Sequence, residues 1–163
     1  NEIFYSLTYG GEALSLAASI ATIKFLKREG VCEIVGENGS YFINEFRNLI
    51  NNNSLSDVIS IIGFPHKSIL LFNDYNSHKA DEIRTLWIKL MTSFGVLNSG
   101  YFIFSFAHDR KIINLLLRKI NSCLKNLKIV IEKNNKILDK NEKIAQKAIR
   151  DILWTAYYVK NQI

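Results

Sequence analysis

Proline, cysteine and glycine are scarce in this sequence, and long hydrophobic runs are missing. Its 163 residues include one proline, two cysteines and eight glycines. So little proline and glycine excludes a collagen-like repeat and argues against long flexible linkers. No stretch approaches the roughly 18 apolar residues of a membrane span, and no signal-peptide pattern opens the chain. We therefore expect a cytoplasmic protein that has no membrane partner.

The two cysteines, Cys32 and Cys123, are far apart and have no metal-ligand spacing. Both are surrounded by aliphatic residues, as buried structural thiols usually are. We therefore predict two reduced core thiols, with neither a disulfide nor a metal site.

Apolar residues are plentiful, since 48% of the chain is hydrophobic and 12% is aromatic. This is enough for one ordinary core. The third to fifth residues, Ile3-Phe4-Tyr5, are already apolar or aromatic, whereas a free terminus is usually polar. We therefore expect that a further part of the protein precedes Asn1.

Hydrophobic periodicity and turn residues predict an α+β fold in which a small antiparallel sheet of about three strands packs against helices. A short Pro65-containing link favours a hairpin between the first two strands, and Asp109 is a plausible N-cap. The expected helices are 10–29, 33–50, 79–94 and 109–131, and the expected strands are 58–64, 68–72 and 101–106. Residues 132–163 are expected to add a basic amphipathic helix with Ile144, Ala148, Ile152, Ala156 and Val159 on one side.

The first expected helix carries no charge between Ala13 and Ile23. A helix that is apolar or small all round has to be covered on several sides. We expect an absent domain or a second subunit to cover the sides that this chain leaves open.

The stretch from Thr8 to Glu12 places a hydroxyl and two glycines before that helix. Free backbone N–H groups at a helix N-terminus attract anions, and glycine permits close backbone approach. Thr8 would then donate to a phosphate oxygen. Alternatively, Thr8 only caps the helix and the glycines only allow the turn.

The segment Phe4 to Ala18 closely resembles the one around a Thr-Phe-Gly-Gly-Glu motif in glutamate-1-semialdehyde aminomutases and related class III aminotransferases. A second, weaker similarity runs through Phe94-Gly95-Val96-Leu97 and Phe104-Ser105-Phe106-Ala107-His108, which resembles the closing strand of that group. The similarity covers roughly residues 3–127, and Tyr9 in place of phenylalanine is a mild departure.

The resemblance implies that this chain is the C-terminal part of an enzyme that uses pyridoxal 5'-phosphate (PLP). Thr8 would bind the cofactor phosphate across a homodimer interface, with the backbone of Leu7 and Tyr9 beside it. Residues 1–30 would form an interface helix, 31–131 the small C-terminal domain, and 132–163 an additional helix.

The resemblance also implies what this part lacks. The Schiff-base lysine and the aspartate that faces the pyridine nitrogen belong to an upstream catalytic domain, so we expect no catalytic residue here and no transamination by this part alone. The whole enzyme would exchange an amino group between a small-molecule donor and acceptor. Gly100 stands where the aminomutase has a glutamate near its substrate, and the carboxylate-binding arginine of other class III enzymes has no counterpart. The resemblance therefore leaves the substrate of the whole enzyme undetermined, with an amino or keto sugar as one alternative.

The charge distribution supports an alternative of another class. Residues 1–109 carry 8 basic and 11 acidic side chains, whereas residues 110–163 carry 13 and 4. Such a basic segment fits a stand-alone module that binds nucleic acid or an acidic partner, or simply a set of solvated lysines. Aromatic residues at core periodicities argue against nucleic acid. His66, His78 and His108 are expected to be structural or exposed, and Trp87 and Trp154 to be core or docking side chains.

Overall fold

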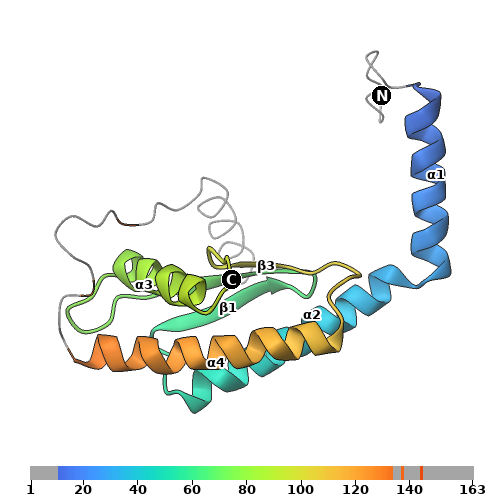
Figure 1. Cartoon of the computed structure of the whole chain (residues 1–163). Coiled ribbons are helices and arrows are strands. Elements are labelled where there is room, and N and C mark those ends of the chain that lie inside the picture. The colour runs from blue at the N-terminus through green and yellow to red at the C-terminus, as the bar shows by residue number, and fades with distance from the viewer. Residues whose placement is uncertain (1–10, 134–136, 138–143, 145–163) are drawn as a thin grey trace, which may run out of the picture. The chain divides into compact units, whose positions relative to one another are not determined.

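The computed structural model describes residues 11–133, 137 and 144 of the chain (Figure 1). It divides into two compact units, Asn1–Ile34 and Val35–Ile163. None of the described helices is long and apolar enough to cross a membrane.

The first unit contains helix α1, which spans Ala13–Arg28. The helix begins three residues later than expected, because Glu12 has an extended backbone and acts as the N-cap. Lys27 and Arg28 lie in its last turn, where cations interact favourably with the helix dipole. Gly30 then takes a positive φ of 59°, which ends the helix as glycine commonly does.

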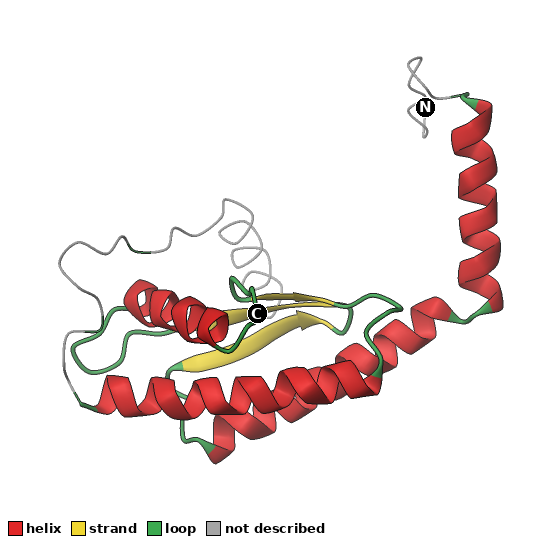
Figure 2. Ribbon diagram, in the orientation of Figure 1, coloured by secondary structure: helices red, strands yellow, loops and turns green. Residues whose placement is uncertain are grey.

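The second unit is an α+β domain, as expected (Figure 2). Its helices are α2 (Val31–Asn52, whose first residues belong to the first unit), α3 (Ala80–Ser93) and α4 (Arg110–Glu132). Its strands are β1 (Ile59–Phe64), β2 (Lys67–Phe72) and β3 (Tyr101–Ile103). The sheet order is β1-β2-β3 and both pairings are antiparallel, so β2 is the central strand.

The predicted hairpin is present. Phe64 pairs with Lys67, so that only Pro65 and His66 connect β1 to β2. Gly63 has a φ of 114°, and a Cβ there would come within 2.6 Å of the Lys67 carbonyl oxygen. The hairpin therefore depends on glycine at this position.

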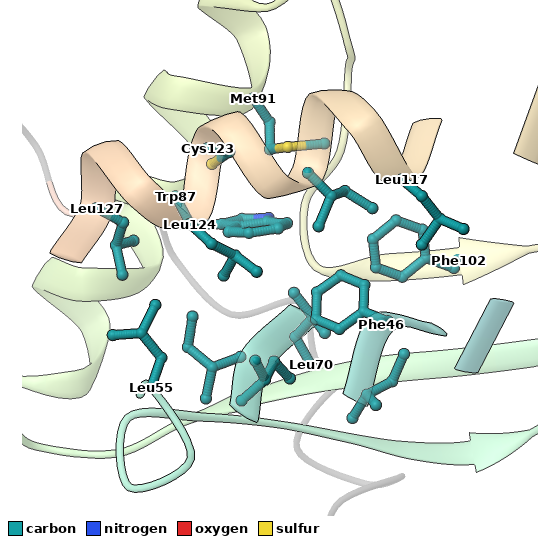
Figure 3. Close-up of a cluster of buried hydrophobic side chains, with 14 of the residues drawn as sticks. Phe46, Leu55, Leu70, Trp87, Met91, Phe102, Leu117, Cys123, Leu124 and Leu127 are labelled. Carbon is teal, nitrogen blue, oxygen red and sulfur yellow. The ribbon is translucent and has the colours of Figure 1, made fainter. Parts of the chain in front are cut away.

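One hydrophobic core joins the three helices of the second unit to one face of the sheet. Ile59, Ile61, Leu70 and Phe102 belong to the same buried cluster as side chains of α2, α3 and α4. Figure 3 shows Trp87 and Met91 of α3 meeting Phe46 of α2 and Leu124 of α4 in this cluster. Trp87 is fully buried, which confirms its expected core position.

Two expectations need correction. Strand β3 ends at Ile103 instead of residue 106, because a turn closes from Ser105 to His108, where the His108 N–H donates to the Ser105 carbonyl at 3.0 Å. Cys123 is buried as expected, but Cys32 is exposed and is therefore not a core thiol.

The expected amphipathic helix over 132–163, with Trp154, lies outside the described residues except at its start. Helix α4 itself ends at Glu132. Ile137 is half-buried against the hydrophobic core, and Ile144 is 48% exposed.

Candidate functional site

The expected phosphate-binding residues, Leu7, Thr8 and Tyr9, lie outside the described residues. The described part of that motif starts at Gly11, and Glu12 follows directly before α1. Their expected roles therefore stay predictions. The structure does show which backbone N–H groups at the start of α1 are already hydrogen-bonded.

The N-terminus of α1 is already occupied by a carboxylate. Glu12 accepts hydrogen bonds from the backbone N–H groups of Leu14 at 2.8 Å and Ser15 at 2.6 Å. Hydrogen bonds from Ser15 and from the Leu14 N–H hold the pKa of the Glu12 carboxyl below its usual value. The Glu12 cap therefore uses two of the backbone N–H groups that were expected to attract an anion at this helix N-terminus.

The two pieces of the second motif come together around a small cavity. Val96 and Leu97 from the first piece, and Phe104 and His108 from the second, line a cavity of about 190 Å³ together with Tyr101–Ile103 and Leu116. The two pieces of the motif, which a glycine turn and a strand separate in the sequence, therefore line the same cavity.

Asn98 fixes the loop beside this cavity. Its Oδ1 accepts from Trp87 Nε1 at 3.2 Å and from the Gly100 N–H at 2.9 Å. Its Nδ2 donates to the Tyr101 carbonyl at 2.6 Å. One amide therefore ties α3, the loop and β3 together.

Charged side chains from two helices hold the same loop. Arg84 Nη2 donates to the Ser99 carbonyl at 3.2 Å, and Lys119 Nζ donates to the Phe94 carbonyl at 2.6 Å. Sequence reasoning missed Asn98, Arg84 and Lys119. No sequence signal distinguished the two charged residues, because α3 and α4 each carry several other charged side chains.

His108 has a structural role within the turn that follows β3. Its Nδ1 lies 2.9 Å from the Ser105 hydroxyl and accepts from the Ser105 backbone N–H at 3.0 Å. Its carbonyl accepts from Asn38 Nδ2 of α2 at 3.1 Å. The contacts fix how the second motif lies against α2.

Gly100, at the position where the resemblance implied a glutamate in the aminomutases, has a backbone conformation that favours glycine. It is buried with a φ of 102°, a conformation that residues with a side chain rarely adopt. Its N–H donates to Asn98 Oδ1 at 2.9 Å, and its carbonyl accepts from the Leu70 N–H at 2.8 Å. A carboxylate here would therefore require a different backbone path.

The other histidines have no catalytic arrangement. His66 is exposed and stacks on Phe64 with ring centroids 5.8 Å apart, whereas His78 is buried in the loop before α3. Within the described residues, no group of three or more His, Cys, Asp or Glu side chains could hold a metal ion.

Three neighbouring aromatic side chains of the described residues pack against one another in the core. Phe42 contacts Phe102 and Phe104 at ring centroid distances of 4.7 and 4.9 Å, and all three are buried. They are therefore not available to stack on bases.

Comparisons with known proteins find two partial similarities, and both are to transaminases. No model of a known protein family matches the chain. The chain is 40% identical over 43 residues to the [LysW]-aminoadipate semialdehyde transaminase of Deinococcus radiodurans, which is 26% of this chain and 10% of that protein. A solved structure described as a transaminase with PLP bound is similar in fold, with a TM-score of 0.65 and 15% sequence identity.

The fold similarity covers 80% of this chain and 31% of the solved transaminase. The chain thus spans less than a third of that structure and matches a tenth of the curated relative. Its fold is the fold of one part of a transaminase, and the α+β prediction is confirmed.

Proposed function

We propose that this chain is the C-terminal small domain of a PLP-dependent aminotransferase or aminomutase of class III. The observation that carries the proposal is the fold similarity over 80% of the chain to part of a transaminase that binds PLP. The 43-residue similarity to a second transaminase and the Thr-Tyr-Gly-Gly-Glu sequence before α1 support it.

In this proposal, Thr8 donates its hydroxyl proton to a phosphate oxygen of PLP, and the backbone at Leu7 and Tyr9 lies beside it. Because Glu12 occupies the N–H groups of Leu14 and Ser15, the turn at residues 7–11 has to supply the donors. PLP would supply the electron sink for amino-group transfer. The lysine that holds it would come from the upstream domain, so that this chain alone is inactive.

Helix α1 is proposed to pack against the upstream domain and a second subunit of a homodimer. It has no buried residue, and Leu14, Leu16, Ile20 and Ile23 are at least half exposed. Apolar side chains on every side of a helix favour burial in a larger assembly. Such an interface would place Thr8 next to the partner's cofactor.

The whole enzyme is proposed to move an amino group between a small-molecule donor and a carbonyl acceptor. The relative from Deinococcus radiodurans is named for a semialdehyde substrate, as the aminomutases are. The buried backbone at Gly100 argues against the glutamate contact of the aminomutases. A semialdehyde other than glutamate 1-semialdehyde is therefore the substrate class that we favour.

A longer protein that includes the proposed upstream domain provides the test. We expect it to purify with PLP and to show the visible absorbance of the bound cofactor. Thr8→Ala should weaken PLP retention by about 10- to 100-fold, because a hydrogen bond to a charged group contributes about 1.5–3 kcal/mol.

Thr92→Ala is the matched control, because the exposed Thr92 hydroxyl donates to the Ile88 carbonyl within α3, away from the proposed interface helix. It should leave PLP retention unchanged. A longer protein that binds no PLP would refute the proposed function. Equal retention by Thr8→Ala and Thr92→Ala would refute the role of Thr8 alone.

A further inference from the structure

Another cavity lies between α2 and α4, and we call it the helix groove. Its volume is about 280 Å³, close to the roughly 300 Å³ at which small-molecule sites begin. Tyr41, Glu45 and Leu49 of α2 line it at four-residue intervals, so they lie on one face of that helix. The other lining side chains come from α4. The groove shares no residue with the motif around Thr8 or with the cavity beside β3.

Two hydrogen-bonded pairs fix how the helices face each other across the groove. The Tyr41 hydroxyl donates to Asn114 Oδ1 at 2.7 Å, and Asn53 Nδ2 donates to Asn121 Oδ1 at 3.1 Å. The two helices therefore run in the same direction. Arg110 also holds Tyr41, because the guanidinium carbon lies 3.9 Å from the centre of the Tyr41 ring.

The same pairs leave amide N–H donors for a ligand. The Oδ1 atoms of Asn114 and Asn121 are engaged, whereas neither Nδ2 has a partner among the described residues. Asn53 is buried and also donates to the Leu49 carbonyl at 2.8 Å, so it meets Asn121 only as a donor. The Asn121 amide therefore cannot turn over without placing two NH₂ groups against each other. The groups that both amides still offer to the groove are mainly donors.

Glu45 and Arg118 add opposite charges that do not neutralise each other. Glu45 follows Tyr41 by one helical turn, as Arg118 follows Asn114, so the two charged residues lie on facing turns. In the part of the chain that the structure describes, no ion pair joins them and the Arg118 guanidinium has no hydrogen-bond partner. Glu45 is partly buried and accepts only from Asn48 Nδ2, at 3.3 Å.

We propose that the helix groove binds a free α-amino acid with an apolar side chain. The carboxylate would lie against the fork of Arg118 and the two amide donors of α4, since a guanidinium binds a carboxylate through two parallel hydrogen bonds. The ammonium group would lie against Glu45. Leu49 and Leu117 supply apolar surface for the side chain.

A zwitterion fits the groove better than a simple anion or cation, because it gives Arg118 and Glu45 a counter-charge at once. The helix groove would bind an amino acid whether or not the whole protein is a transaminase. It would therefore be a second site for small molecules, apart from the proposed cofactor site.

An NMR titration of the full chain with L-leucine tests this site. The side-chain amide signals of Asn114 and Asn121 should shift and saturate, whereas that of Asn126, exposed on α4 outside the groove, should not. Leucinamide has no carboxylate, and 4-methylpentanoate has no ammonium group. Each should bind at least about ten-fold more weakly than L-leucine, because each loses hydrogen bonds between charged groups.

Two variants assign the charges, and a third is the matched control. Arg118→Gln should remove the preference of about ten-fold for L-leucine over leucinamide, and Glu45→Gln should remove the preference over 4-methylpentanoate. Lys125→Gln also removes one positive charge from the exposed side of α4, but outside the groove, and should keep both preferences. Each preference is a ratio within one variant, so that a change in stability alone does not alter it.

Three results would overturn the proposal. One is the absence of a saturable shift of the Asn114 and Asn121 amides with L-leucine. Another is equal binding of L-leucine and either analogue by the unaltered chain, which would show that one of the two charges is not recognised. The third is a shift of the same signals with protein concentration and without L-leucine, which would identify a second copy of the chain as the occupant.

Discussion

Gly39 of α2 lies directly against the backbone of Pro65 in the turn between β1 and β2. A Cβ at Gly39 would overlap with the Pro65 carbonyl group, which is backbone and has little freedom to move. Helix α2 and the hairpin therefore contact each other through main-chain atoms.

Gly39→Ala should lower the free energy of unfolding by about 1–3 kcal/mol, the usual cost of overpacking a close contact. Urea denaturation measures the change. Gly36→Ala is the matched control, because no atom lies within 4 Å of a Cβ there. It should stabilise α2 by about 0.5–1 kcal/mol, since alanine favours helix interiors. A similar effect of both substitutions would refute the close contact.

Asn98→Ala should lower the free energy of unfolding by about 2–3 kcal/mol, because Trp87 Nε1 and the Gly100 N–H lose their acceptor. Tryptophan fluorescence during denaturation reports stability, and in a Trp154→Phe background it also reports the environment of Trp87. Ser99→Ala is the control, since the backbone of Ser99, and not its exposed side chain, accepts from Arg84. A larger effect at Ser99 than at Asn98 would contradict this assignment.

The cap of α1 should fail in acid. The pKa of Glu12 is lowered from 4.5 by hydrogen bonds from Ser15 and Leu14 in the folded chain. The cap therefore contributes stability above the unfolded pKa, and this contribution is lost as the pH falls through the folded value. In an NMR titration, the amide signals of Leu14 and Ser15 should shift below pH 4.5. In Glu12→Gln they should not titrate.

Only one native thiol should react with a disulfide reagent at pH 8. Cys32 is exposed, whereas burial raises the pKa of Cys123 to about 12, so that about one Cys123 in ten thousand is a thiolate. The thiolate that the reagent releases, counted before and after unfolding with guanidinium, gives the number of reactive thiols in the folded and unfolded chain. Cys32→Ser should abolish the reaction of the folded chain, and two reactive thiols in the folded state would contradict the burial of Cys123.

Local signals made most of the fold predictable. Asp109 caps α4 as expected, because its side chain accepts from the Ile112 N–H three residues along the chain. The hairpin followed from two apolar runs around Pro65, and the core position of Trp87 followed from helical spacing. In each case the decisive residues lie within a few positions of one another.

Hydrophobic periodicity does not contain the features that sequence reasoning missed. The end of β3 depends on the turn from Ser105 to His108, and the occupied N-terminus of α1 depends on the direction in which the Glu12 side chain turns. For the candidate site, the sequence indicated the motif around Thr8 but could not show that Asn98 would join Trp87, because nothing in the sequence pairs an amide with an indole eleven residues away.

The central position of β2 also sets the order in which the sheet assembles. Its pairing with β1 closes over two residues, whereas its pairing with β3 has to wait until the chain has passed through α3. Closing a longer loop costs more entropy, and distant contacts slow folding. During synthesis the hairpin is therefore the early nucleus, and until Tyr101–Ile103 emerges its second edge is an unpaired strand that a chaperone or a neighbouring nascent chain can reach.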